Sequence, residues 1–313
     1  MDSHGRDVFT SKENRLTSKE NRGQRRLAIA LLVTAGILVA EVVGGFLANS
    51  LALLSDAGHV LTDLVALVFS YLAARFATRP ATHRRTFGFY RLEILSALAN
   101  GVTLVVVALV IFYEAYQRLQ APEPVKGLEV FVIATIGLLG NLLAAWLLGD
   151  AGGGLNIRGA MLHVLGDAVS SVGVIIGGLV IIFTGWYLID PLLSVGIGLL
   201  IIFGALRLIM ESVDILLEAT PKSLDLPEMV EDVRGVEGVR DLHDVHVWSI
   251  TSGLYAMSGH LLIDDMMITG SSQILAKVRE LLERKYRIEH TTFQLECEHC
   301  GAAETLCGMI GSK

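Results

Sequence analysis

Charged side chains are scarce in this sequence of 313 residues, because Asp, Glu, Lys and Arg together make up only 18% of it. Soluble domains usually carry about a quarter, and the 52% of hydrophobic residues and the mean hydropathy of +0.57 point the same way. Charge is sparse between residues 27 and 217 and dense on either side. The composition therefore excludes an ordinary soluble protein and predicts a membrane part flanked by polar segments.

Cysteine, excess basic charge and a protease motif are also lacking. The three cysteines, Cys297, Cys300 and Cys307, all lie near the C-terminus, which excludes a disulfide framework. The net charge of −7 leaves no basic surface of the kind that binds nucleic acid. No H-E-x-x-H sequence occurs, so a membrane zinc protease is not indicated and we expect no enzymatic activity.

Six segments are apolar over about the 20 residues that a helix needs to cross a bilayer. They are about Leu27–Leu47, Leu53–Phe76, Leu92–Tyr116, Leu128–Leu148, Gly159–Phe183 and Leu188–Met210. Lys and Arg are concentrated before the first segment and between the second and third, which marks these parts as cytoplasmic. An even number of spans then places both termini in the cytoplasm.

Polar segments divide the rest of the chain. The N-terminal tail (1–26) is too polar to be a cleaved signal peptide and repeats TSKENR without an apolar face, so we expect it to be disordered. The transmembrane domain (27–218) is followed by a cytoplasmic domain (219–300) and a C-terminal tail (301–313). The cytoplasmic part is patterned helix, strand, strand, helix, strand, with Asp225 as a helix cap before Pro227, which predicts a small two-layer α+β domain.

Two of the apolar segments contain the same pair of polar residues. The second contains HVLTD, from His59 to Asp63, and the fifth contains HVLGD, from His163 to Asp167. Residues four apart share a helix face, and ionisable groups at bilayer depth usually face a cavity or a partner. Two imidazoles and two carboxylates together suit tetrahedral Zn²⁺. The alternative is a buried hydrogen-bonded contact between helices, but the repetition favours a metal site.

Metal binding at such a site is linked to protons, because it needs neutral imidazoles and ionised carboxylates. Histidine titrates near neutral pH, so we hypothesise that Zn²⁺ moves outward through this site as protons move inward. Of the other polar residues, Glu41 could line the pathway or pack between helices, and Asp56 could support the site from the same helix face. Glu114 and Asp190 lie near the ends of predicted spans, where solvation at the interface is the simpler interpretation.

Four longer stretches resemble the cation diffusion facilitator family, and its bacterial zinc-efflux branch in particular. They are SLALLSDAGHVLTD, RRTFGFYRLEILSALANG, NIRGAMLHVLGDAVSSVGVI and LHDVHVWSITSG. The resemblance implies six membrane helices, a cytoplasmic metallochaperone-like domain and a homodimer that exchanges Zn²⁺ for H⁺. It also implies that the transport site consists of His59, Asp63, His163 and Asp167, with the histidine at position 59 typical of zinc-preferring members.

The resemblance further implies zinc in the cytoplasmic domain, bound by residues at the positions of His246, His260, His290 and Glu296. Because His243 lies three residues before His246, strand alternation predicts that these two point to opposite faces and that only one faces a given site. Cys297 and Cys300 have the C-x-x-C spacing of a zinc clip, with two free thiols as the alternative.

The sequence departs from some members in the cytoplasmic loop between the second and third spans, where His83 is the only histidine and cannot form a further site. The resemblance implies that Arg91 and Glu218 link the two protomers, and a solvated surface pair is the alternative. We predict a homodimeric zinc/proton antiporter of a bacterial inner membrane that confers metal resistance. The alternatives are transport of another divalent cation such as Co²⁺, Cd²⁺ or Fe²⁺, a membrane metal sensor that does not transport, and a passive channel.

Overall fold

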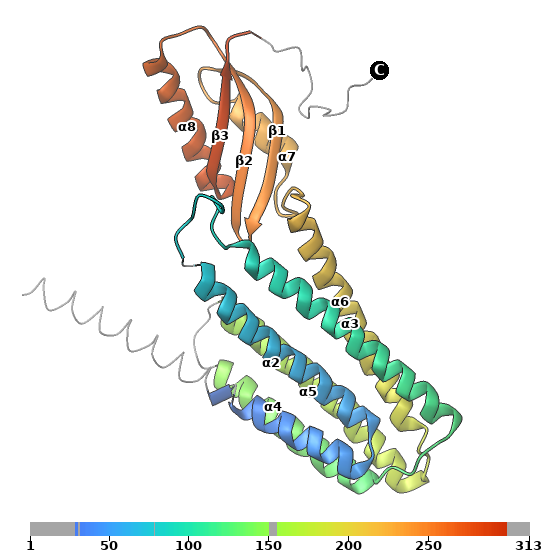
Figure 1. The fold of residues 1–313 in the computed structure, drawn as a ribbon. Helices are drawn as coiled ribbons and strands as arrows, with labels where there is room; N and C mark the ends of the chain where they lie inside the picture. Colours follow the sequence, from blue (N-terminus) through green and yellow to red (C-terminus); the bar gives the residue numbers. More distant parts are fainter. Residues whose placement is uncertain (1–28, 31, 78, 150–154, 299–313) are drawn as a thin grey trace, which may run out of the picture. The chain divides into compact units, whose positions relative to one another are not determined.

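The computed structural model describes residues 29 to 298 of the chain, except for residues 31, 78 and 150–154 (Figure 1). Helices form the first part of the chain. An apolar helix at Leu32–Ala48 is followed by α2 (Leu51–Ala77), α3 (Arg91–Gln120), α4 (Gly127–Gly149), α5 (Leu155–Thr184) and α6 (Ile189–Leu216). These helices correspond to the six predicted segments, with ends that differ by a few residues.

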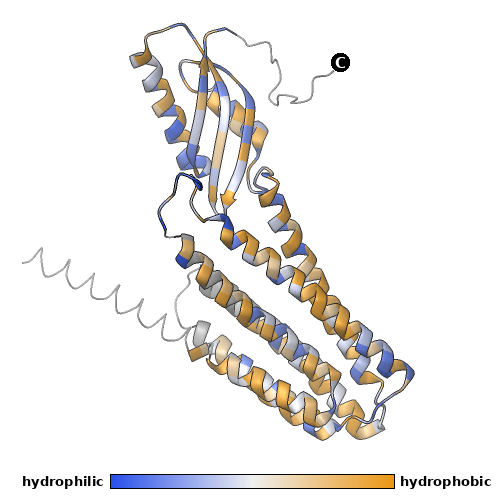
Figure 2. Cartoon of the chain, viewed as in Figure 1, coloured by the Kyte–Doolittle hydropathy of each residue, from blue (hydrophilic) through white to orange (hydrophobic). Residues whose placement is uncertain are grey.

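Four of the described helices are long and apolar enough to cross a membrane. They are α3, α4 over Gly127–Trp146, α5 over Val164–Thr184, and α6. Their outer surfaces carry large apolar side chains that are well exposed, such as Trp146, Phe183 and Phe203. Hydrophobic residues run along these helices in Figure 2. Apolar surface of this extent indicates contact with lipid, and the predicted class of α-helical membrane protein is confirmed.

Contacts between residues divide the chain into two compact units, which are described separately. The first comprises residues 1–67 and 100–206, and the second comprises residues 68–99 and 207–313. In the first unit, a Cβ added at Gly44 would meet Ile133 of α4 at 2.2 Å, and one at Gly178 of α5 would meet the backbone of Phe131 at 3.0 Å. Small residues therefore let the first helix, α4 and α5 pack closely, as membrane helices commonly do.

The C-terminal domain, in the second unit, is the predicted α+β fold. Its elements are α7 (Leu226–Arg234), β1 (Val239–Thr251), β2 (Leu254–Ile263), α8 (Ile268–Tyr286) and β3 (Ile288–Glu296). The three strands form one sheet in the order β1-β2-β3, with β1 antiparallel and β3 parallel to β2. The Asp225 side chain accepts a hydrogen bond from the Glu228 N–H, which confirms the predicted cap of α7.

The core of this domain lies between the sheet and its two helices. Its fully buried side chains include Met229 and Val233 from α7, Leu261 from β2, and Val278 and Leu282 from α8. The alternation of strand residues leaves the other face of the sheet to a different set of side chains, which includes most of the histidines of the domain. The helices thus cover one face, and the second face carries the chemistry described below.

Candidate metal centres

Helix α2 carries the first half of the paired motif, and its N-terminus is capped from another helix. Asp190, at the start of α6, accepts hydrogen bonds from the Ser50 hydroxyl at 2.5 Å and from the backbone N–H groups of Leu51 at 2.7 Å and Ala52 at 3.4 Å. Only 1% of the Asp190 surface is exposed. The simpler sequence interpretation of interfacial solvation is therefore wrong, because the carboxylate satisfies N–H groups that have no partner within their own helix.

The two copies of the motif converge where α2 faces α5. The Nε2 atom of His59 lies 3.5 Å from Oδ2 of Asp63 and 4.0 Å from Oδ1 of Asp167. Metal–ligand bonds of about 2.0–2.1 Å place neighbouring ligand atoms of a tetrahedron roughly 3.4 Å apart. Both separations from His59 are slightly longer than this, so a small inward movement of the side chains would bring His59 and either carboxylate to the spacing of two zinc ligands.

The exposure of these side chains differs between the helices. His59 and Asp63 retain 29% and 23% side-chain exposure, whereas Asp167 retains 6%. His163 belongs to α5, one turn before Asp167, but its side chain lies outside the described residues. The structure therefore describes three of the four predicted ligands of the transport site, and the metal-binding role of all four stays a prediction.

Asp56 lies one turn before His59 on α2 and is linked to α5. Its Oδ1 atom accepts a hydrogen bond of 2.7 Å from the Ser170 hydroxyl, and only 3% of its surface is exposed. The Thr62 hydroxyl is occupied elsewhere, since it donates to the backbone carbonyl of His59. Asp56 thus supports the position of α2 beside α5 through a hydrogen bond, as expected of a residue next to the ligand set.

A second group of ligand atoms lies on the uncovered face of the C-terminal sheet. Ligand atoms of His243, His260 and Glu296 all lie within 4.8 Å of one another. The Nε2 atom of His243 is 3.3 Å from Oε2 of Glu296, and Nδ1 of His260 is 2.9 Å from Oε1. His243 is almost fully buried, with 1% side-chain exposure. Two imidazoles around one carboxylate form a mixed nitrogen and oxygen set that suits Zn²⁺.

Other carboxylates orient these histidines. Oδ2 of Asp241 lies 3.7 Å from Nδ1 of His243, on the ring atom that faces away from Glu296. Asp244 lies between two histidines, with its oxygens 3.1 Å from Nε2 of His246 and 3.5 Å from Nε2 of His260. A carboxylate on the second ring nitrogen sets the tautomer of a metal-binding histidine, and Asp244 lies beside the second ring nitrogen of His260.

The prediction that His243 and His246 point to opposite faces is wrong. His243 pairs with His260 across the sheet, and His246 pairs with Ser258. Between these two pairs the chain advances by three residues on β1 but by only two on β2. Asp244 supplies the extra residue of this β-bulge and adopts a positive φ of 48°. A bulge restarts the alternation of a strand, and both histidines therefore share the face that carries His260. Sequence reasoning missed His243 and Asp244 as members of the cluster.

Among the described residues, the other predicted ligands do not join this cluster. His290 pairs with Ala256 near the start of β3, and its ring packs edge-on against Phe87 with the centroids 5.5 Å apart. It lies six positions before Glu296 along the strand, which amounts to about 20 Å. Cys297 is a free, exposed thiol after the end of β3. Cys300 lies outside the described residues, so the C-x-x-C clip stays a prediction.

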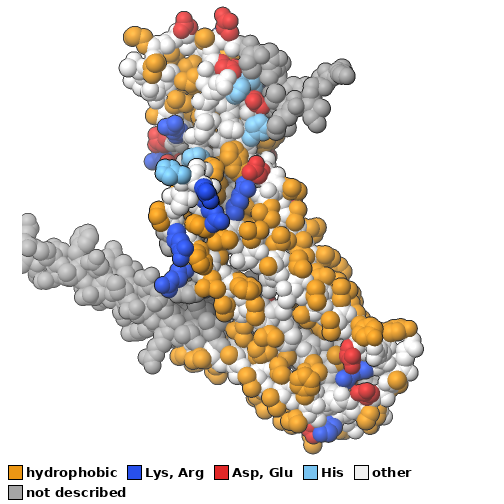
Figure 3. Space-filling model, in the orientation of Figure 1, with side chains coloured by type: hydrophobic (Ala, Val, Ile, Leu, Met, Phe, Trp, Pro, Cys, Tyr) orange, Lys and Arg blue, Asp and Glu red, His pale blue; other side chains and the backbone are white. Residues whose placement is uncertain are grey.

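The second unit also holds the basic loop between α2 and α3. Lys and Arg side chains gather beside this loop on the face shown in Figure 3. Arg91 and Glu218 form an ion pair of 2.8 Å within one chain, with 40% and 59% side-chain exposure. His83 is exposed, and it belongs to none of the groups of three possible metal ligands found among the described residues.

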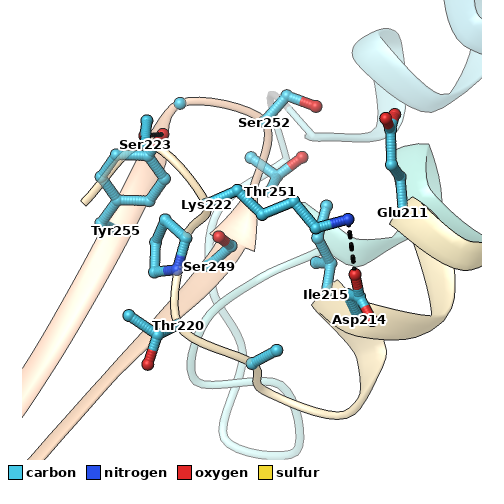
Figure 4. A pocket seen from close by; sticks show the side chains of 13 residues that line it. Glu211, Asp214, Ile215, Thr220, Lys222, Ser223, Ser249, Thr251, Ser252 and Tyr255 are labelled. Atoms are coloured by element: carbon cyan, nitrogen blue, oxygen red, sulfur yellow. Dashed lines mark hydrogen bonds and ion pairs between the residues drawn. The ribbon is translucent and has the colours of Figure 1, made fainter. Parts of the chain in front are cut away.

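A separate cavity of about 320 Å³ opens beside the end of α6 and the β1–β2 turn (Figure 4). Hydroxyl groups of Ser223, Ser249 and Thr251 line it together with Lys222, whose Nζ atom is 2.9 Å from Oδ2 of Asp214. No predicted metal ligand lines this cavity. The ion pair neutralises Lys222, and the carboxylates that line the cavity, Glu211 and Asp214, belong to no group of three possible metal ligands among the described residues.

Comparison with known proteins was made by family and by individual relative. The description "Cation efflux transmembrane domain" matches residues 27–217, and "Cation efflux protein, cytoplasmic domain" matches residues 221–298. The zinc transporter ZitB of Escherichia coli is 45% identical over 284 residues, which cover 90% of each chain. The cadmium, cobalt and zinc/H⁺-K⁺ antiporter of Bacillus subtilis is 42% identical over 283 residues, covering 89% of this chain and 91% of that protein.

A further relative has a counterpart among solved structures. The metal cation efflux system protein CzcD of Cupriavidus metallidurans is 40% identical over 297 residues, which cover 93% of this chain and 94% of that protein. The solved metal-bound C-terminal domain of the CzcD transporter is 30% identical, with a TM-score of 0.22, and covers 23% of this chain and 99% of that domain.

Proposed function

The chain belongs to the cation diffusion facilitator family, in its zinc-efflux branch, and on this premise we propose that it exports Zn²⁺ from the cytoplasm in exchange for protons. It is a multi-pass membrane protein for metal efflux. The observation that supports zinc as cargo most directly is the approach of His59, Asp63 and Asp167 from two helices, with ligand atoms 3.5 and 4.0 Å apart. We propose His163 as the fourth ligand.

Proton exchange follows from the chemistry of these ligands. Zn²⁺ binds neutral imidazole and ionised carboxylate, so protons leave the site when the metal binds and return when the metal leaves. Exposure of the site to one side of the membrane at a time would convert this competition into antiport. Relatives named as a zinc transporter and as a zinc/H⁺-K⁺ antiporter support both the cargo and the coupling.

We propose that the protein is a regulated transporter. We propose that two chains form a homodimer in a bacterial inner membrane with both termini in the cytoplasm. We also propose that zinc bound by His243, His260 and Glu296 of the C-terminal domain favours one state of the dimer. A metal that binds one conformation better shifts the population toward it.

The decisive experiment measures Zn²⁺ uptake into proteoliposomes under an imposed pH gradient. We expect gradient-driven uptake by the wild type and none by Asp63→Ala, because the substitution removes one ligand and its negative charge. Asp264→Ala is the matched control, since its exposed carboxylate makes only a 3.6 Å pair with Arg240. Uptake that ignores the gradient, or that survives Asp63→Ala, would refute the antiport mechanism at this site.

A broader cargo is the second candidate. One relative is named for cadmium and cobalt as well as zinc, and mixed nitrogen and oxygen ligands accept several divalent metals. Competition of Cd²⁺ and Co²⁺ with Zn²⁺ for uptake in the same vesicles distinguishes the two. Equal inhibition at equal concentration would establish a general divalent exporter in place of a zinc exporter.

A further inference from the structure

A carboxylic side chain lies unused in the interior of the helical unit. Glu41, in the helix Leu32–Ala48, is 1% exposed. Its Oε2 atom is buried and has no hydrogen-bond partner among the described residues. An ionised carboxylate in this position would cost several kcal/mol without a compensating cation or donor. The side chain must therefore bind a proton or a cation for part of the time.

The neighbouring helices offer Glu41 no lysine or arginine as a partner among the described residues. Helix α4 approaches through Gly137, where an added Cβ would lie 3.0 Å from Oε1 of Glu41. There is no titratable residue in the apolar stretch of α4 from 130 to 149 and no other in the helix of Glu41 itself. The sequence contains no Lys or Arg in 27–74, 127–157 or 159–206. No lysine or arginine of these segments can therefore neutralise the carboxylate.

The charges that act on Glu41 come from α2 and α5, and they are the carboxylates of Asp56 and Asp167. Asp56 accepts a hydrogen bond from Ser170, whereas Glu41 Oε2 accepts none from the described residues. Like charges in a low-dielectric interior repel, so adjacent carboxylates do not all ionise together. Among the three, Glu41 has the least support for a negative charge while no metal is present.

We propose that Glu41 is a proton-binding site of the transporter, which holds a proton while the transport site lacks metal and releases it when Zn²⁺ binds at His59, Asp63 and Asp167. The charge of Zn²⁺ cancels that of Asp167 and attracts a further negative charge. The O–H bond of Glu41 then breaks, its electron pair stays on the carboxylate, and the proton passes to water. Glu41 does not ligate the metal, and this inference rests on the proposed function.

Calorimetry counts the protons involved. Zn²⁺ is titrated into the full-length protein in detergent, in two buffers of different ionisation enthalpy, for the wild type and Glu41→Gln. We expect Glu41→Gln to release about one proton fewer per transport-site zinc, with zinc affinity at alkaline pH changed less than threefold. Glu129→Gln is the matched control, because this acidic residue of α4 is paired with Lys126 at 3.3 Å and is 41% exposed.

Two further measurements separate this role from a structural one. In an Asp63→Ala background the Glu41→Gln change should leave the proton count unaltered, because the remaining zinc binds the C-terminal domain. Glu41→Asp, which keeps a carboxyl group, should restore the wild-type count. If Glu41→Gln does not fold, infrared difference spectra of the wild type still test the proposal. The carbonyl band of a protonated carboxylic acid should disappear when Zn²⁺ is added.

The possible results are distinct. An unchanged proton count in Glu41→Gln, or no loss of an acid carbonyl band, overturns the proton-binding role. A loss of zinc affinity of more than tenfold at every pH overturns it as well and makes Glu41 a ligand or a structural residue. If the proton count falls as expected but wild-type vesicles show no gradient-driven uptake, the proposed antiport fails and the proton site remains.

Discussion

Replacement of Asp190 tests whether the cap between α6 and α2 maintains the transport site. The carboxylate holds the N-terminus of α2 through a 2.5 Å bond from Ser50 and a 2.7 Å bond from the Leu51 N–H, both buried. Each hydrogen bond to a charged group contributes about 1.5–3 kcal/mol. Asp190→Ala removes both and should lower the free energy of unfolding by about 3–6 kcal/mol. Asp190→Asn retains one acceptor oxygen and should lose about half as much.

The assay is thermal unfolding of the purified protein in detergent, combined with zinc uptake at a temperature where both variants stay folded. A loss of 1 kcal/mol lowers the melting temperature by about 2–4 °C for a domain of this size, so Asp190→Ala should melt roughly 6–24 °C below the wild type. Uptake should also fall, because a frayed α2 shifts His59 and Asp63.

The control is Glu114→Gln on α3. Glu114 forms an ion pair of 3.3 Å with Arg118, and the Glu114 side chain is 43% exposed. Exposed ion pairs of this kind contribute about 1 kcal/mol or less to the free energy of unfolding. The Glu114→Gln variant should therefore melt within about 4 °C of the wild type. If Asp190→Ala melts as Glu114→Gln does, or if it unfolds early but transports normally, Asp190 does not position α2 and the reasoning is refuted.

Two further predictions concern the C-terminal domain. His243→Ala should reduce the zinc bound per chain by about one ion, whereas His290→Ala should leave it unchanged. Metal analysis after dialysis measures this. An equal loss of zinc in both variants would contradict the proposed zinc site at His243, His260 and Glu296. Hydrogen bonds from Lys285 and Tyr286 lower the pKa of Asp232, so its stabilisation is complete above the unfolded value of about 3.9 and is lost as the pH falls through the lowered folded value. The melting temperature of Asp232→Asn should therefore depend less on pH below about pH 4 than that of the wild type, and parallel curves would contradict this.

Sequence patterns predicted the fold well because its main elements depend on local properties. The hydropathy of each segment defined the helices to within a few residues, since a span must be apolar along its whole length. The succession of helices and strands along the C-terminal domain was predicted from alternation and turn residues, and Asp225 was correctly identified as a cap. His59 and Asp63 share a helix face because of their spacing alone, so this half of the predicted transport site could be identified from the sequence.

The errors arose where one residue changed the geometry or where a partner came from far along the chain. Alternation placed His243 and His246 on opposite faces, but the bulge at Asp244 restarts the alternation. The sequence hinted at this only through a short polar side chain, a type that tolerates positive φ. His290 shares a strand with Glu296 and was grouped with it, although the two lie at opposite ends of β3.

The sequence by itself determined that the protein spans a membrane, carries two copies of a histidine–aspartate pair and ends in a small α+β domain. These properties follow from hydropathy and periodicity, which act within a single helix or strand. Only the tertiary structure decided that Asp190 caps α2, that His243 joins His260 and Glu296, and that Glu41 is buried without a partner for its Oε2 atom among the described residues. Each of these features depends on packing between segments that are distant in sequence. The same packing buries a polar group and determines which partner, if any, it can bind.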